Sequence, residues 1–249
     1  MFNLFKTQAG NTIRLTNNRR LQQALLNAGI EDPATVTSLV LSGTMIKDDF
    51  KFIKKTMSKT LQVLDISNVT LENSKLRNDA FNRCTGLISV TVPNWITEIG
   101  KGAFCNCSSL KTFVIPSSVT KIRELTFWGC KSLTSIVIPN SIVELEFRAF
   151  NNCTSLTLVT LPDSVIKIGS SAFGKCSSLT SINIPNSVKE IGNGVFAQCS
   201  ELKSITIPKS VIKIGEFVFA NCDIFITVDK DNSVYTSDFG NLYKKIEPN

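Results

Sequence analysis

Cysteines are the side chains of this chain with the widest range of chemistry, and seven of the eight recur every 23 residues. Thiolates ligate metals, form disulfides and attack electrophiles. Metal sites need converging ligands, commonly paired as Cys-x-x-Cys, whereas an even spacing sets these thiols in a straight row. The row therefore predicts reduced, buried cysteines that serve as small apolar filler. They are Cys84, Cys107, Cys130, Cys153, Cys176, Cys199 and Cys222.

Cys105 is the one cysteine outside this row, which makes it the best candidate for an accessible thiol. Other signals of catalysis are missing from the sequence. The chain has no histidine, which excludes histidine-based acids, bases, triads and zinc sites. Its glycines fall at turns and form no phosphate-binding loop. We therefore expect no enzyme, no metal and no cofactor.

The elements that hold the cysteines must repeat with the same period. A phenylalanine precedes each cysteine of the row by three residues, and no residue is inserted or lost between units. Such strict spacing predicts near-identical coils stacked on one another. Phe113 and Ile115 alternate with polar or exposed positions, as in a strand with one buried face, and Pro116 ends that strand because it has no N–H. The phenylalanines are Phe81, Phe104, Phe127, Phe150, Phe173, Phe196 and Phe219.

The units follow, with apolar replacements at some positions, the pattern Ala-Phe-x-x-Cys, then Leu, then Ile-x-Ile-Pro and Ser-Val. This signature resembles that of the BspA-like leucine-rich repeat family over residues 80–222. The resemblance implies an α/β repeat solenoid, in which a right-handed array of 23-residue units carries a parallel sheet on its concave face and a shorter strand or turn opposite.

The two ends of the chain break the period. In residues 1–79 the sequence predicts short helices near 21–26 and 48–55, and strands near 36–41 and 61–66, which we interpret as a helix-containing N-terminal cap of irregular leucine-rich units. Residues 223–249 are expected to be an irregular C-terminal segment. Because that end would leave a sheet edge less covered, homo-oligomerisation stays open.

A charged row occupies the predicted outer strand, and its sign alternates at every coil. Each carboxylate would lie beside ammonium groups of neighbouring coils, which avoids like-charge contacts and fixes the register. A charged docking strip is the alternative, but exposed pairs contribute only about 0–1 kcal/mol each. The row consists of Glu98, Lys121, Glu144, Lys167, Glu190 and Lys213.

Residues that depart from the repeat are the candidates for binding a partner. Val114, Val137 and Leu158 form an apolar centre among small polar residues on the expected concave face. Trp95 and Trp128 replace smaller residues of other units, either as interface anchors or as fillers of local gaps. Together with Cys105, these residues form the predicted partner-binding set.

The net charge of +7 is spread along the chain, so no nucleic-acid surface is expected, and apolar runs are too short for membrane insertion. We expect a non-enzymatic scaffold or regulator that docks a protein partner. Resemblance to leucine-rich regulators implies an intracellular enzyme, such as a protein phosphatase, as one partner class. The alternative is a cell-surface or secreted BspA-like adhesin that binds host matrix or other cells. Unpaired cysteines and the lack of a visible signal peptide favour a cytoplasmic location.

Overall fold

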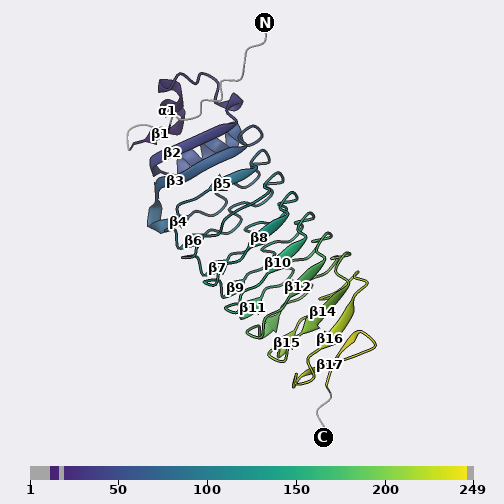
Figure 1. Cartoon of the computed structure of the whole chain (residues 1–249). Coiled ribbons are helices and arrows are strands. Elements are labelled where there is room, and N and C mark those ends of the chain that lie inside the picture. The colour runs from purple at the N-terminus through teal and green to yellow at the C-terminus, as the bar shows by residue number, and fades with distance from the viewer. Residues whose placement is uncertain (1–11, 17–19, 246–249) are drawn as a thin grey trace.

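The chain forms an elongated stack of coils that runs from an N-terminal cap to a C-terminal hairpin (Figure 1). The computed structural model describes residues 12–16 and 20–245. Strands of successive coils pair in parallel with a shift of one 23-residue unit, as in Leu158 with Ser181 and Lys167 with Glu190. The predicted repeat solenoid is therefore confirmed. In the described residues all helical elements precede Lys75, so the array itself is built from strands and turns.

One side of the stack, which we call the long-strand face, is built from the longer strand of each coil. Ile136 and Val159 point inward and are buried, while their strand neighbours point to solvent. Parallel pairing joins β8, β10 and β12 into one sheet and β14 and β16 into another. The strands are β5 (Ser89–Thr91), β8 (Ser135–Val137), β10 (Leu158–Thr160), β12 (Ser181–Asn183), β14 (Ser204–Ile207) and β16 (Phe225–Val228).

Another side, the short-strand face, carries two residues of each coil in strand conformation. The first residue of each strand is the charged residue of the alternating row, and the second is an Ile or Leu that packs inward. β4 pairs with β6, and the remaining five strands form one parallel sheet. The strands are β4 (Lys75–Leu76), β6 (Glu98–Ile99), β7 (Lys121–Ile122), β9 (Glu144–Leu145), β11 (Lys167–Ile168), β13 (Glu190–Ile191) and β15 (Lys213–Ile214).

The phenylalanine and cysteine columns fill the interior on the third side of the coil. Consecutive Phe rings from Phe81 to Phe219 stack with centroids 5.3 to 5.9 Å apart. From Cys107 onward, each cysteine of the row also donates its S–H to the carbonyl oxygen of the phenylalanine 26 residues earlier, as Cys153 does to Phe127 at 3.1 Å. The cysteines are free thiols, as predicted. They are more than apolar filler, because each of these bonds joins one coil to the one before it.

The N-terminal cap contains both helices and both strands that the sequence predicts for residues 21–66. It also contains β1, a strand that the sequence reasoning missed, which pairs with β2. The buried carboxylate of Asp49 joins the two helices, because it accepts hydrogen bonds from Leu21 N and Ile46 N at 2.9 Å each. The cap comprises β1 (Ile13–Leu15), α1 (Leu21–Asn27), the 3₁₀ turn Pro33–Thr35, β2 (Ser38–Met45), α2 (Lys47–Phe52), the π-helical turn Ile53–Met57, β3 (Val63–Leu71) and the turn Glu72–Ser74.

The C-terminal segment, predicted to be irregular, instead forms a second cap. After β16, strands β17 (Tyr235–Asp238) and β18 (Asn241–Lys244) make an antiparallel hairpin that lies over the last coil. Ile226 N donates to Gly240 O and Val228 N to Ser237 Oγ, so donors on the open edge of β16 are satisfied. The prediction of a poorly covered edge at this end was therefore wrong.

Asn232 fixes the position of this hairpin. Its buried side chain donates to Pro208 O and Val211 O, and its Oδ1 accepts from the N–H groups of Val234 and Tyr235. The two N–H donors of this amide thus attach the tail to the array, and its oxygen fixes the turn into β17.

Candidate functional site

The long-strand face carries no charge at its solvent-facing positions between Ser89 and Thr206. Alternation along each strand sets two such residues on every coil. Small polar side chains dominate, and the apolar exceptions lie together near the middle. The positions are Ser89, Thr91, Thr112, Val114, Ser135, Val137, Leu158, Thr160, Ser181, Asn183, Ser204 and Thr206.

Val114, Val137 and Leu158 are the apolar solvent-facing residues of three successive coils on this face, as the sequence predicted, and we call them the patch. Val114 and Val137 are exposed by 81% and 80% and are direct partners in a parallel bridge. Leu158, exposed by 54%, lies on the next strand, where it pairs with Ser135. Apolar side chains this exposed gain nothing from the fold, so the patch is available for a contact.

A hollow of about 330 Å³ opens at this patch. It is bounded by two consecutive coils, 112–115 and 135–139, and both exposed valines line it. Apolar atoms dominate its walls, with hydroxyl groups of Thr112 and Ser135 at its edge. Its lining residues are Thr112, Phe113, Val114, Ile115, Ser135, Ile136, Val137 and Pro139.

The pairing of the long strands is interrupted at the same place. The coil at 112–114 forms no strand, and its strand pairing is reduced to the single bridges Ser89–Thr112 and Val114–Val137. Just before it, Lys111 N donates to Ile88 O and Lys111 O accepts from Thr134 N. The ladder is also open between β12 and β14. Phe113 takes the inward position that Val90, Ile136 and Val159 take elsewhere. The sequence reasoning placed Phe113 on the buried face but assigned it no functional role, although its size in an otherwise aliphatic column is a visible signal.

Trp128 and Trp95 lie away from this hollow. The half-buried Trp128 donates its indole N–H to Asn151 Oδ1 at 3.1 Å, and the Asn151 amide donates in turn to Ser171 O. Trp95 is 42% exposed and occupies the position where later coils carry a serine that bonds to the preceding coil, as Ser141 does to Val119 O. Trp128 thus has an internal partner that fits a packing role, and partner binding by either residue stays a prediction.

The prediction that Cys105 is accessible was wrong. Only 9% of this residue is exposed, and the Asn106 amide covers its sulfur at 3.7 Å. Burial raises the pKa of the Cys105 thiol, and the nearby Asp79 carboxylate raises it further. Cys222, at the end of the row, is the cysteine with the greater exposure, although burial raises its pKa as well. A high pKa leaves little thiolate at neutral pH, so these cysteines are weak nucleophiles.

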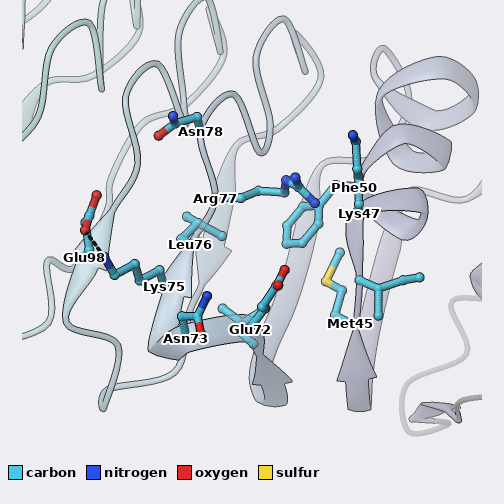
Figure 2. Close-up of a pocket in the computed structure, with 12 residues that line it drawn as sticks. Met45, Lys47, Phe50, Glu72, Asn73, Lys75, Leu76, Arg77, Asn78 and Glu98 are labelled. Atoms are coloured by element: carbon cyan, nitrogen blue, oxygen red, sulfur yellow. Dashed lines mark ion pairs between the residues drawn. The ribbon is translucent and has the colours of Figure 1, made fainter.

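A second hollow, of about 340 Å³, lies where the cap meets the array (Figure 2). Met45, Phe50 and Leu76 form its apolar wall, and the Lys75–Glu98 ion pair, at 2.7 Å, closes one side. Lys47, Arg77 and Glu72 bring both signs of charge to the remaining rim. This mixture selects no single class of ligand.

The charged row of the short-strand face is ion-paired from Glu98 to Lys167, whereas Glu190 and Lys213 have no ion-pair partner within 4.0 Å among the residues that the structure describes. Glu144 pairs with Lys121 at 2.7 Å and with Lys167 at 3.2 Å. Partial burial acts to raise the pKa of Glu144, but hydrogen bonds from both lysines outweigh it and lower the pKa overall. Glu98 departs from the simple row, because it pairs with Lys75 and Arg123 rather than with Lys121. Arg123 reaches Glu146 in the other direction, so the ion pairs span several coils.

Comparison with known proteins identifies the family. The sequence profile of the BspA type leucine rich repeat region matches six copies, over residues 49–134 and 126–241. This chain belongs to that family. No curated protein matches it significantly.

Solved structures of bacterial leucine-rich repeat proteins share the fold. The Treponema pallidum leucine-rich repeat protein TpLRR is 31% identical, with a TM-score of 0.56 over 61% of this chain and 72% of that chain. A leucine-rich repeat protein from Bacteroides ovatus is 24% identical, with a TM-score of 0.60 over 81% of this chain, which spans 57% of the Bacteroides chain. The family fold is that of a protein-interaction or adhesion module and is generally non-enzymatic.

The described part of this BspA-type chain contains neither a metal-binding cluster nor a membrane-spanning helix. Residues 12–16 and 20–245 contain no group of three or more Cys, Asp or Glu side chains placed to hold a metal ion. Over the same residues, no helix has the length and apolar character needed to cross a bilayer.

Proposed function

We propose that this protein is a non-catalytic binding module that docks another protein on the long-strand face, at the patch formed by Val114, Val137 and Leu158. The observation that carries the proposal is the coincidence of that exposed apolar patch with an apolar hollow on a face without charge. Interfaces typically place apolar residues at their centre, depleted of charge and surrounded by polar residues.

The chemistry of the face also indicates what kind of surface it accepts. Hydroxyl groups of Ser and Thr surround the patch, and burying them against a neutral surface costs much less than burying ions. A nucleic acid would need Lys and Arg to neutralise its phosphates, and the solvent-facing positions supply neither. The preferred partner is therefore a protein surface with apolar side chains and few charges. An intracellular enzyme, such as a protein phosphatase, is the first partner class to test.

The test compares two double variants on the same face. Val114→Asp with Val137→Asp places two charges in the patch, and Asn183→Asp with Thr206→Asp places two charges outside it. All four positions are exposed, so both variants should keep the free energy of unfolding within about 1 kcal/mol of the parent. Capture of a partner by the tagged protein should fall at least about tenfold with the patch variant only, because the new charges must be desolvated. Equal capture by both variants would refute the patch.

The place of action is tested separately. Labelling of intact cells with an impermeant reagent should leave the chain unmodified if it acts inside the cell. Strong labelling would instead support adhesion at the cell surface and would move the search for partners to host matrix and other cells.

A further inference from the structure

The hollow and the interruption of the long strands share one residue, Phe113. Its inward position is occupied by aliphatic side chains on the neighbouring coils, Val90 and Ile136. The phenylalanine is 4% exposed, so its ring is accommodated inside the stack rather than turned to solvent.

The ring of Phe113 packs against two rungs of the Phe stack at once. Its centroid lies 4.6 Å from that of Phe104 and 5.4 Å from that of Phe127, at interplanar angles of 53° and 55°. The rings of Phe104 and Phe127 remain parallel with their centroids 5.5 Å apart, so the spacing of the Phe stack is not enlarged beside the ring of Phe113. A close-packed interior resists extra volume, and the strand that carries the ring has to move instead.

The backbone of this coil departs from regular strand pairing. Three consecutive pairs join β8 with β10 and β10 with β12, where the inward residues are aliphatic. The ladder is also open between β12 and β14, where both inward residues are isoleucines, but there the two strands keep their other neighbours. The Phe113 coil keeps one bridge to each neighbour, and these bridges involve different residues, Thr112 toward β5 and Val114 toward β8. The space beside this coil is the hollow of about 330 Å³.

We infer that Phe113 is the positioning residue of the docking site: its ring wedges the coil out of the sheet and so opens the hollow between Val114 and Val137. The inference rests on the proposed function for its biological meaning, but the wedge itself is a property of the free protein. The occupant is one apolar side chain on an uncharged stretch of a partner protein. The hollow is lined mainly by apolar atoms, and no charged residue among its lining could pair with an ion.

The first experiment measures amide hydrogen exchange in the free protein. Phe113→Ile should restore regular pairing and slow exchange at residues 112–115 and 135–137 by at least about tenfold, because exchange there requires opening of the strand ladder. Phe113→Leu is the second variant, which has the same volume as isoleucine but branches at Cγ rather than Cβ and so protects against a failure of the first to fold. Ile182→Val, in the same column two coils beyond Ile136, is the control and should leave these amides unchanged. Unchanged exchange in both Phe113 variants would overturn the wedge.

The second experiment tests the occupant by photocrosslinking. A benzoylphenylalanine replaces Thr160, the direct strand partner of Val137, in otherwise parental and Phe113→Ile chains. A heterologous crosslink in the parental background that falls at least fivefold with Phe113→Ile supports the inference. A crosslink of undiminished strength shows that docking ignores the hollow and overturns it.

The remaining outcomes distinguish the wedge in the free protein from the docking of a partner on this face. Slowed exchange without any crosslink in the parental background rejects the proposed docking face and leaves the wedge established. A crosslink to a second copy of this chain, with matching dimers in light scattering, overturns the assignment of a heterologous partner.

Discussion

The long-strand and short-strand faces are built from the same coils, but only the short-strand face carries charged side chains at its solvent-facing strand positions. On the short-strand face, Glu144 lies between Lys121 and Lys167, so its charge is matched by neighbouring coils. On the long-strand face the solvent-facing side chains carry no charge, and Val114 and Val137 are exposed without a partner. A repeat can thus pair charges of one face within the array while apolar side chains of another face stay exposed. The face with the exposed apolar side chains is the better place to look for a partner.

The largest contrast should appear between two adjacent residues of β8. Ile136 points inward and is 5% exposed, whereas Val137 points to solvent. Replacement of Ile136 by Ala should lower the free energy of unfolding by about 2–5 kcal/mol because it leaves a cavity. Val137→Ala should stay within about 0.5 kcal/mol. Chemical denaturation measures both, and similar losses from the two variants would contradict the assignment of the faces.

An intermediate effect on the free energy of unfolding is expected from ionisation of the buried thiols of the cysteine row. Burial raises the pKa of Cys153 to about 12, from an ordinary value of 9.0. A raised pKa in the fold means that its contribution to stability is complete below pH 9 and is lost as the pH rises toward 12. Each such thiol should therefore lower the unfolding free energy with a slope that rises toward about 1.4 kcal/mol per pH unit between pH 9 and pH 12.

Denaturation of the parent and of Cys153→Ala at pH 8, 9 and 10 checks this value. Between pH 9 and 10 the parent should lose about 1 kcal/mol more unfolding free energy than the variant. Parallel pH dependences would show that Cys153 already ionises in the fold.

The smallest effect concerns the ion pairs of the short-strand face. Glu144→Gln should cost about 0–1 kcal/mol at neutral pH, and less in high salt, because the pairs are partly exposed. The lowered pKa of Glu144 means that this contribution is present above about pH 4.3 and is lost as the pH falls through the folded value.

Glu190→Gln is the matched control, because Glu190 has no ion-pair partner within 4.0 Å among the residues that the structure describes. Denaturation at pH 7 and pH 3 should separate Glu144→Gln from this control only at pH 7. A larger loss for Glu190→Gln would contradict the pairing.

The repeat fold could be predicted because the same pattern of residues recurs in every unit. The spacing of the phenylalanines and cysteines left one way to stack the coils, and alternation then placed Val114 and Val137 outside. What the sequence did not reveal depends on volumes and contacts between coils. The burial of Cys105, the displacement by Phe113 and the amide of Asn232 that attaches the hairpin each require the neighbouring coil to be known.

Because the sign of the charged row alternates, odd and even coils of the array are not interchangeable. Removing the single unit that carries Lys167 would bring the coil of Glu144 against that of Glu190, and two carboxylates would become neighbours. Removing that unit together with the next would bring Glu144 beside Lys213 and keep opposite charges in contact. Shortening or lengthening of this array should therefore be tolerated best in steps of two units, so that its natural building block is a pair of coils.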